Sequence, residues 1–337
     1  MNIEKFKDLS NLNTFGVRII ADYYAAVTSE EELEEALNFA SFKNVSCQIL
    51  GGGSNTLFVN NYRGMVIHIV NKGIRWNKGS NDIKQKVEVS AGEEWHSFVQ
   101  SCLQRNLYGL ENLALIPGTV GGSPIQNIGA YGVEVKDFIM SVRVFDQVKK
   151  NWVMFSNEDC GFSYRDSVFK NSNRYIVFSV LFNLNRRWKP NLDHEELFKR
   201  FSNNKVKVGD VFDEVCNLRS SKLPDTKEQG NAGSFFKNPI ISKDDFNDLN
   251  SKFPDMPAYN IDEKGEVKIP AAWLLDQLGW RGKRVGDAAV SHKHALIIIN
   301  NGNATGKDIM NLAGEMSATV YDRYGISLKP EVKIIDS

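Results

Sequence analysis

The hydrophobic positions near the N-terminus alternate between helical and strand spacing. Residues 28–40 begin with Thr28 and Ser29, two residue types that cap helices, and then repeat leucine and alanine at intervals of three and four. This spacing predicts a helix. Short apolar runs follow at residues 45–50 and 65–70, each bounded by glycine or asparagine, as strands are. We therefore expect a first α+β unit over residues 1–72.

Strand patterns dominate from residue 73 onward. Apolar runs rich in valine, isoleucine and phenylalanine occupy residues 87–92, 141–146, 151–156 and 174–184. The second and third runs flank the short segment 147–150, and this arrangement predicts a hairpin. Helical spacing is present at 95–103 and at 210–221, and the second of these ends before Pro224. We expect this unit to cover residues 73–222.

The last third of the chain returns to a mixed pattern. Helical spacing is found at residues 242–252, 270–278 and 305–324, and the run ALIIIN at 295–300 predicts a strand. These elements predict a third unit over residues 223–325. The tail 326–337 has strand character, so we expect it to pack back onto an earlier domain.

Composition narrows the class of protein. The 337 residues include 41 basic and 41 acidic side chains, a balance that does not favour nucleic acid or an anionic membrane as a partner. The first ten residues lack the apolar core of a signal peptide, and no apolar run is long enough to span a bilayer. We expect a cytoplasmic protein whose four scattered cysteines are reduced and mostly buried.

Two glycine-rich strings are the first candidates for chemistry. Residues 51–55 read GGGSN directly after an expected strand, so backbone N–H groups could point at an anion such as a pyrophosphate. The string matches neither standard nucleotide fingerprint, and a tight turn is the alternative. Residues 117–132 contain five glycines, two prolines and no charge. Such a loop suits the polar edge of a flavin, whereas an irregular connector is the alternative.

Three single residues could act on a substrate. Arg165 could pair with a carboxylate, beside Tyr164, although a surface arginine is the plainer interpretation. Ser234 follows small residues and could present its hydroxyl, or it could simply begin a strand. Glu331 lies in an otherwise apolar run that we expect to be a strand, where it is either a cleft residue or a solubilising edge charge. His292 and His294 lack a third ligand at metal spacing, so we assign no metal.

Together these strings occur in an order that resembles one family, the UDP-N-acetylenolpyruvoylglucosamine reductases of peptidoglycan synthesis. The resemblance covers almost the whole chain. Its carriers are NTFG at 13–16, LGGGSN at 50–55, GLENLALIPGTVGGSPIQNIGAYG at 109–132, GFSYRDSVFK at 161–170, LPD at 223–225, GNAGSFFKNP at 230–239 and LKPEV at 328–332.

The resemblance implies an α+β fold with an FAD-binding region of the vanillyl-alcohol oxidase type. That region would have two parts, residues 1–72 and 73–222. A separate α+β substrate-binding domain would cover 223–325, and the C-terminal strand at 326–337 would pack back onto the FAD-binding region.

The resemblance also implies an activity. A member of this family uses NADPH and FAD to reduce UDP-N-acetyl-3-O-(1-carboxyvinyl)-glucosamine to UDP-N-acetylmuramate, with hydride passing through flavin N5 to C3 and a proton reaching C2. The partners would be these small molecules, with no nucleic acid and no membrane insertion. The sequence does not indicate a protein partner.

Individual roles carry over by matching motifs. Ser234 is similar to the family's proton donor, and Arg165 and Glu331 resemble the pair that handles the enolpyruvyl carboxylate. The cofactor-binding positions would be Gly51, Gly52, Gly53, Ser54, Asn55, Pro117, Gly118, Thr119, Gly121, Gly122, Ser123, Ile128, Gly129 and Arg219. The substrate-binding positions would be Tyr164, Arg165, Lys222, Asn238, Tyr259, His194 and His294.

Two of these positions depart from the pattern of the family's longer form. His194, within WKPNLDHEEL, occupies the place of a tyrosine on a loop over the substrate diphosphate, and His294 falls where relatives can have glutamine.

Two other functions are alternatives to the reductase activity. They are a flavin-dependent alcohol oxidase of the same fold and a UDP-sugar sensor that has lost its chemistry.

Overall fold

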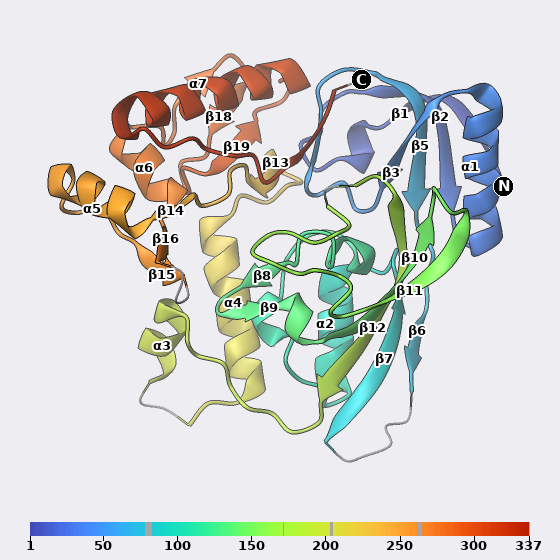
Figure 1. Ribbon diagram of the computed structural model, residues 1–337, viewed down its shortest axis with the longest axis horizontal. Helices are drawn as coiled ribbons and strands as arrows, with labels where there is room; N and C mark the ends of the chain where they lie inside the picture. The colour runs from blue at the N-terminus through green and yellow to red at the C-terminus, as the bar shows by residue number, and fades with distance from the viewer. Residues whose placement is uncertain (78–82, 171, 203–204, 262–264, 337) are drawn as a thin grey trace. The chain divides into compact units, whose positions relative to one another are not determined.

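A computed structural model describes residues 1–77, 83–170, 172–202, 205–261 and 265–336 of the chain (Figure 1). The chain forms two compact units that interleave along the sequence. Unit 1 comprises Met1–Lys7, Ala21–Gly53 and Arg63–Arg219, and unit 2 comprises Asp8–Ile20, Ser54–Tyr62 and Ser220–Ser337. The four-part division expected from the sequence stays a prediction.

Runs of strands are separated by single helices or helix pairs along the chain, an order typical of an α+β protein. The α-helices are α1 (Glu30–Lys43), α2 (Trp95–Gln104), α3 (Glu195–Phe201), α4 (Val208–Lys222), α5 (Lys243–Lys252), α6 (Ala271–Gln277) and α7 (Gly306–Tyr324). Short 3₁₀ helices are η1 (Ser10–Leu12), η2 (Glu111–Leu113), η3 (Val120–Gly122) and η4 (Val135–Asp137).

The strands are β1 (Glu4–Asp8), β2 (Ile20–Val27), β3 (Ser46–Leu50), β4 (Thr56–Phe58), β5 (Tyr62–Ile69), β6 (Ile74–Trp76), β7 (Lys84–Ser90), β8 (Gly129–Ala130), β9 (Val133–Glu134), β10 (Ile139–Asp146), β11 (Asn151–Ser156), β12 (Tyr175–Asn185), β13 (Gly230–Ser234), β14 (Ile240–Ser242), β15 (Tyr259–Ile261), β16 (Glu266–Lys268), β17 (Arg284–Val285), β18 (Ala288–Val290), β19 (Ile297–Asn300) and β20 (Lys333–Ile335).

Unit 1 contains a four-stranded sheet with the order β1-β2-β5-β3, beside which helix α1 lies (Figure 1). Strands β3 and β5 are parallel, and Leu50, the last residue of β3, is paired with His68. The expected helix is confirmed as α1: the Ser29 hydroxyl caps it by accepting from the Glu32 backbone N–H. Its leucine and alanine stripe is buried because that face packs into the core.

The second sheet of unit 1 has the order β11-β10-β12-β7-β6. The predicted hairpin is confirmed, since β10 and β11 pair antiparallel from Ser141 opposite Ser156 to Asp146 opposite Asn151. Helix α2 places Trp95 and Phe98 in the core, where the Phe98 ring lies 5.1 Å from that of Phe182 on β12. The two sheets and their helices therefore share one continuous hydrophobic core within unit 1.

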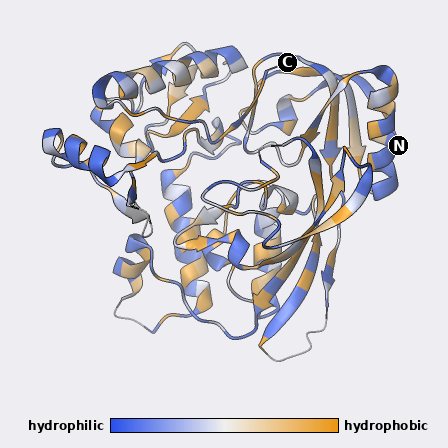
Figure 2. Ribbon diagram, in the orientation of Figure 1, coloured by the Kyte–Doolittle hydropathy of each residue, from blue (hydrophilic) through white to orange (hydrophobic). Residues whose placement is uncertain are grey.

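Unit 2 contains a sheet with the order β13-β19-β18-β17 and a smaller one with the order β14-β16-β15. Helix α7 packs against β18 and β19, and its predicted apolar face is buried. A capping box between Thr305 and Asp308 begins α7, and Gly325 in the left-handed conformation ends it. Figure 2 shows that α5 is largely hydrophilic, in agreement with its lack of buried side chains among the residues described.

The C-terminal tail differs from its predicted form. Strand β20 pairs in parallel with β4, but it begins only at Lys333. The expectation that Glu331 lies inside a strand was therefore wrong. Pro330 forms an isolated antiparallel bridge with Phe236, and Glu331 lies in a bend between that bridge and β20.

Helix α3 was not predicted by the hydrophobic pattern, because seven residues are too few to show helical periodicity.

In the part of the chain that the structure describes, no helix is both long and apolar enough to cross a membrane. The four cysteines are free thiols, with Cys102 and Cys160 buried and Cys47 and Cys216 half-buried.

Candidate active site

The GGGSN string forms a turn directly after β3, as its glycines suggest. A Cβ atom on Gly51 would lie 2.9 Å from Thr119 Oγ1, and one on Gly52 would lie 2.9 Å from the Gly118 Cα. The turn and the 117–132 segment therefore approach more closely than side chains would allow. Two of the predicted cofactor strings thus meet within unit 1, through backbone.

The 117–132 segment is an irregular loop held by backbone hydrogen bonds to residues 91–95. The Gly118 carbonyl accepts from Trp95 N–H at 3.0 Å, and Gly121 N–H donates to the Ala91 carbonyl at 2.8 Å. A Cβ on Gly121 would lie 2.5 Å from the Ala91 Cβ, so only glycine fits there. Ser123 is buried, and its hydroxyl donates to the Val120 carbonyl at 2.7 Å. Ser123 therefore holds the loop together.

Several residues of this segment adopt left-handed backbone conformations. They include Asn127 and Tyr131, with φ of 42° and 48°, and Leu115 just before the segment has φ of 55°. Such conformations are costly for residues other than glycine and persist only where the surrounding structure enforces them. Asn127 is fully buried and is held by bonds from its amide to Glu134 and to the Ser163 carbonyl.

Arg165 is attached to the same loop. It lies in a tight turn with φ of 52°, closed by reciprocal backbone bonds between Ser163 and Asp166. Its Nη2 donates to the Gly129 carbonyl at 2.7 Å, and its guanidinium lies 6.0 Å from the centre of the Tyr164 ring. The structure thus brings Tyr164 and Arg165 to the predicted flavin loop.

Arg219, near the end of α4, adds a second guanidinium to unit 1. Its Nε is buried and has no hydrogen-bond partner among the described residues. Burial lowers the pKa of Arg219, and the like charge of Arg165 lowers it further. A buried arginine normally has an acceptor, so this position favours an anionic or carbonyl ligand.

The segment before α3 is fastened to the other end of the loop. Asn112, which is buried, donates from Nδ2 to the carbonyl oxygens of Tyr131 and Asn191 at 2.8 and 3.0 Å. The rings of Tyr131 and His194 meet edge to face at 4.9 Å. His194 is therefore next to the glycine-rich loop. Neither Asn112 nor Tyr131 was predicted as a site residue, although both belong to the 109–132 string.

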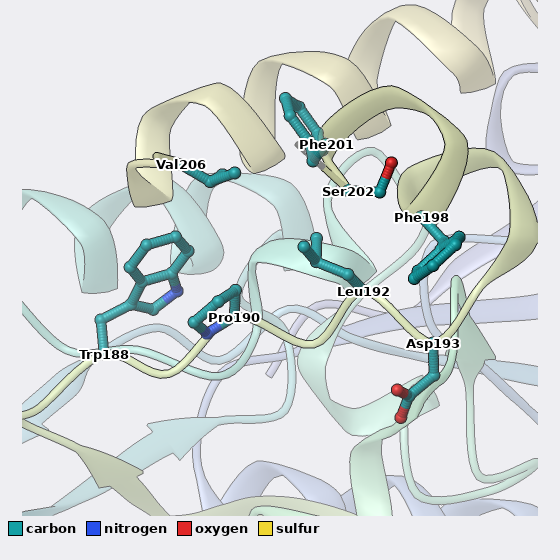
Figure 3. Close-up of a pocket in the computed structure, with 8 residues that line it drawn as sticks. All are labelled: Trp188, Pro190, Leu192, Asp193, Phe198, Phe201, Ser202 and Val206. Carbon is teal, nitrogen blue, oxygen red and sulfur yellow. The ribbon is translucent and has the colours of Figure 1, made fainter. Parts of the chain in front are cut away.

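A hollow of about 440 Å³ lies beside this segment (Figure 3). Figure 3 shows the rings of Trp188, Phe198 and Phe201 around Leu192. None of the predicted site residues lines the hollow, although His194 follows Asp193 at its edge. The hollow is therefore not the site that the sequence predicted.

Unit 2 holds the remaining predicted residues. Ser234 ends β13, after Gly233 with φ of 70° and a break in the pairing with β19. The Glu331 backbone N–H donates to the Phe235 carbonyl at 2.8 Å. The Asn55 amide donates to the Glu331 carbonyl at 3.3 Å. The Glu331 backbone therefore contacts both the Asn55 side chain and Phe235, the residue that follows Ser234.

The predicted substrate-binding residues of unit 2 are in different environments. Asn238 uses its Oδ1 to accept from Ala271 N–H at the start of α6, which leaves its amide hydrogens for a ligand. Tyr259 is exposed on β15. Burial lowers the pKa of His294, whose Nδ1 accepts from Leu296 N–H at 3.2 Å, and Lys222 is close enough to lower it further. His292 and His294 lie in the turn between β18 and β19.

No cluster of three metal-ligating side chains occurs among the residues that the structure describes. The groups gathered in the two units are instead glycine amides, guanidinium groups, a hydroxyl and a carboxylate. This set suits anionic organic ligands.

Comparison with known proteins agrees with a site for anionic organic ligands. A family model described as an FAD-binding domain matches residues 21–148. A second, described as the C-terminal domain of UDP-N-acetylenolpyruvoylglucosamine reductase, matches residues 225–335.

Curated relatives match over almost the whole chain. The UDP-N-acetylenolpyruvoylglucosamine reductase of Flavobacterium johnsoniae is 43% identical, over 99% of this chain and 100% of its own. That of Neisseria gonorrhoeae is also 43% identical, over 96% and 95%. The crystal structure of the Thermus caldophilus enzyme is 26% identical and superimposes with a TM-score of 0.69, covering 100% of both chains. The predicted α+β fold, with its FAD-binding region, is confirmed, and the chain belongs to the UDP-N-acetylenolpyruvoylglucosamine reductase family.

Proposed function

We propose that this protein uses NADPH to reduce the enolpyruvyl group of UDP-N-acetyl-3-O-(1-carboxyvinyl)-glucosamine, which yields UDP-N-acetylmuramate for peptidoglycan synthesis. The observation that carries the proposal is the 43% identity to a reductase of that name over the full length of both chains. The predicted catalytic residues Ser234, Arg165 and Glu331 are all present, which supports chemistry as well as binding.

The residues of unit 1 fit FAD. Gly52 and Gly118 approach too closely for a side chain, and Gly52 is exposed, so a dinucleotide could reach its bare backbone amide. The buried Nε of Arg219 lacks an acceptor within the described chain, and a flavin carbonyl or phosphate could provide one. We assign the 51–55 string to the pyrophosphate and the 117–129 string to the flavin ring. When bound, FAD supplies hydride transfer from NADPH to C3 of the substrate.

Each catalytic residue has a role that follows from its chemistry. Negative charge moves to C2 and the carboxylate when C3 receives hydride. Arg165 would stabilise that charge through its guanidinium, and Glu331 would hydrogen-bond the group or orient the arginine. Ser234 would deliver the proton to C2. A hydroxyl is a weak acid, but a carbanion-like centre is a strong base, so position matters more than a matched pKa.

The predicted substrate-binding residues belong partly to unit 1 and partly to unit 2. Tyr164 is attached to the loop with Arg165, and Lys222, Asn238, Tyr259 and His294 are contributed by unit 2. The proposed substrate-binding roles of His194 and His294 rest only on the places of these residues in the family's motifs. A cytoplasmic location stays a prediction, consistent with the need for NADPH and a UDP-sugar.

Two half-reactions test the proposal. The purified protein should be yellow and should release its FAD on acid denaturation, since no residue for a covalent link is assigned. Anaerobic NADPH should bleach the flavin, and the enolpyruvyl substrate should restore its absorbance. Reoxidation by oxygen but not by substrate would indicate an oxidase. A protein that binds the substrate but never reoxidises with it would be a sensor.

A further inference from the structure

The segment that leads into the glycine-rich loop is held by two neighbouring residues of helix α2. The indole Nε1 of Trp95 donates to the Leu113 carbonyl at 2.8 Å, and the Trp95 backbone N–H donates to the Gly118 carbonyl at 3.0 Å. Between these two contacts, the Leu115 backbone N–H donates to Nδ1 of His96 at 3.0 Å. The path of the chain into the loop is therefore fixed at three points.

Leu115 is the strained point of this path. Its φ of 55° is in the left-handed region, which a leucine occupies only where the surrounding structure enforces it. Leu115 is half-buried, so its N–H needs an acceptor, and Nδ1 of His96 supplies one. The bond to His96 thus stabilises the unusual turn through which the chain enters the loop.

The His96 ring is in turn held by helix α4. It stacks on the Phe212 ring, with 5.7 Å between the ring centres and an angle of only 6° between the planes. This stacking restricts rotation of the imidazole about its Cβ–Cγ bond, so Nδ1 stays directed at Leu115. Burial also lowers the pKa of His96, and an accepting Nδ1 requires a neutral ring. The surroundings of His96 therefore favour its role as an acceptor.

The turn at Leu115 bears on the cofactor because of where the chain goes next. Three residues later Gly118 meets the 51–55 turn, since a Cβ on Gly52 would lie 2.9 Å from the Gly118 Cα. Two backbone segments this close leave no free space for the loop to shift toward the turn. A changed conformation at Leu115 would therefore displace Gly118 from Gly52, and both glycines belong to the strings assigned to FAD.

We propose that His96, held by Phe212, is a positioning residue for FAD: its Nδ1 keeps Leu115 in the left-handed conformation that sets the glycine-rich loop against the 51–55 turn. The inference rests on the proposed assignment of these two strings to FAD. The contribution of His96 passes through Leu115 and requires no contact between the imidazole and the cofactor.

Two substitutions of His96 separate the acceptor from the ring. In His96→Asn the side-chain oxygen has the reach of Nδ1, so the bond to Leu115 is kept although the ring is lost. His96→Phe keeps a ring on Phe212 but has no acceptor. Dialysis of the purified holoprotein against a series of FAD concentrations should give a dissociation constant raised roughly three- to tenfold for His96→Phe, the effect of one lost hydrogen bond. His96→Asn should remain within about twofold of wild type.

Phe212→Leu tests the stacking contact and leaves His96 itself unchanged. Leucine keeps the apolar bulk but cannot stack, so the imidazole is held less firmly and FAD binding should weaken about twofold. Added to His96→Phe, the same change should have no further effect on FAD binding, because the acceptor that Phe212 orients is already gone. Phe42→Leu, at a ring 81% exposed on α1, is the control and should leave the dissociation constant unchanged. Unaltered FAD binding by Phe212→Leu would refute the orienting role of this ring, whether or not His96→Phe folds.

Thermal unfolding distinguishes positioning from general damage. At a fixed FAD concentration, the increase in melting temperature that FAD produces should be smaller for His96→Phe than for wild type. A merely structural role would lower the melting temperature and leave the FAD dissociation constant unchanged, and that result would overturn the proposal. Equal dissociation constants for His96→Asn and His96→Phe would overturn it as well.

The wild-type protein and Gly52→Ala separate this inference from the function on which it rests. A wild-type protein that binds no FAD would refute the proposed function and the role of His96 together. The Cβ of Gly52→Ala would lie 2.9 Å from the Gly118 Cα, so the turn and the loop must move apart. If Gly52→Ala weakens FAD binding and His96→Phe does not, the assignment of the strings stands and the role of His96 is refuted. If neither weakens it, the strings are not the FAD site and both assignments fail.

Discussion

The backbone N–H of Glu331 donates to the carbonyl oxygen of Phe235 at 2.8 Å. This bond joins the bend before β20 to the residue that follows Ser234. The proposed proton donor and the proposed catalytic carboxylate, which are far apart in the sequence, thereby belong to segments joined by backbone, whose geometry is less variable than that of side chains. The relationship supports a shared role for Ser234 and Glu331.

Ser234→Ala tests the proton donor. Flavin reduction by NADPH should be nearly unchanged, because that half-reaction needs no proton from the serine. Reoxidation by the enolpyruvyl substrate should slow by about a hundred- to ten-thousandfold, the usual effect of removing a positioned acid. Stopped-flow absorbance separates the two steps. Ser234→Cys should recover part of the rate, and reoxidation within a few-fold of wild type would move the acid role to Glu331.

Arg165→Lys tests the guanidinium on the flavin loop. Lysine keeps the charge but loses the planar fork and the 2.7 Å bond to the Gly129 carbonyl. We expect kcat/KM for the UDP-sugar to fall about ten- to hundredfold, as for a lost charged hydrogen bond. Arg143→Lys is the control, since Arg143 pairs with Glu30 at 2.7 Å in the same unit. Equal kinetics for the two variants would exclude a specific role for Arg165.

Alanine substitutions at the adjacent residues Gly121 and Gly122 test the packing of the glycine-rich loop. A Cβ at position 121 would lie 2.5 Å from the Ala91 Cβ, whereas one at position 122 meets only Thr119 Oγ1, at 3.9 Å. Gly121→Ala should destabilise the apoprotein by about 1–3 kcal/mol through overpacking. Gly122→Ala should leave the apoprotein stability unchanged and weaken FAD binding if this glycine faces the flavin. Urea unfolding and FAD titration measure the two effects, and equal destabilisation would contradict the packing argument.

Asp146 should make stability depend on pH. Arg174 donates to its carboxylate from Nε at 2.9 Å and from Nη2 at 2.6 Å, and this pair holds the pKa of Asp146 well below its usual range. A carboxyl group whose pKa is lower in the folded state stabilises the fold fully above its unfolded pKa of about 3.9, and that stabilisation is lost as the pH falls.

Asp146→Asn should therefore lower the urea midpoint at pH 7, and the difference from wild type should shrink below about pH 4. Asp322→Asn, at an exposed position of α7, is the control and should show no such trend. A difference that stays constant down to pH 3 would mean that the lost contacts, rather than the charge, stabilise the hairpin.

The long elements and the order of the motifs could be predicted from the sequence alone. Helix α1, the β10–β11 hairpin and the buried face of α7 could be predicted, because their periodicity and caps are local properties of the chain. The family could be identified for a related reason. Its glycine strings and polar residues are contiguous, and a contiguous string is read without knowledge of the fold.

Which of these strings meet, and which residues support them, depends on tertiary packing and could not be predicted. The approach of Gly52 to Gly118 and the bond from Arg165 to Gly129 depend on packing between segments far apart in the sequence. The bend at Glu331 replaced the expected strand, because Pro330 bridges to Phe236 whereas β20 pairs with β4. The parallel register of β3 and β5 pairs His68 with Leu50, the residue before Gly51. Pairing register is a long-range property, so no local pattern could have predicted that contact.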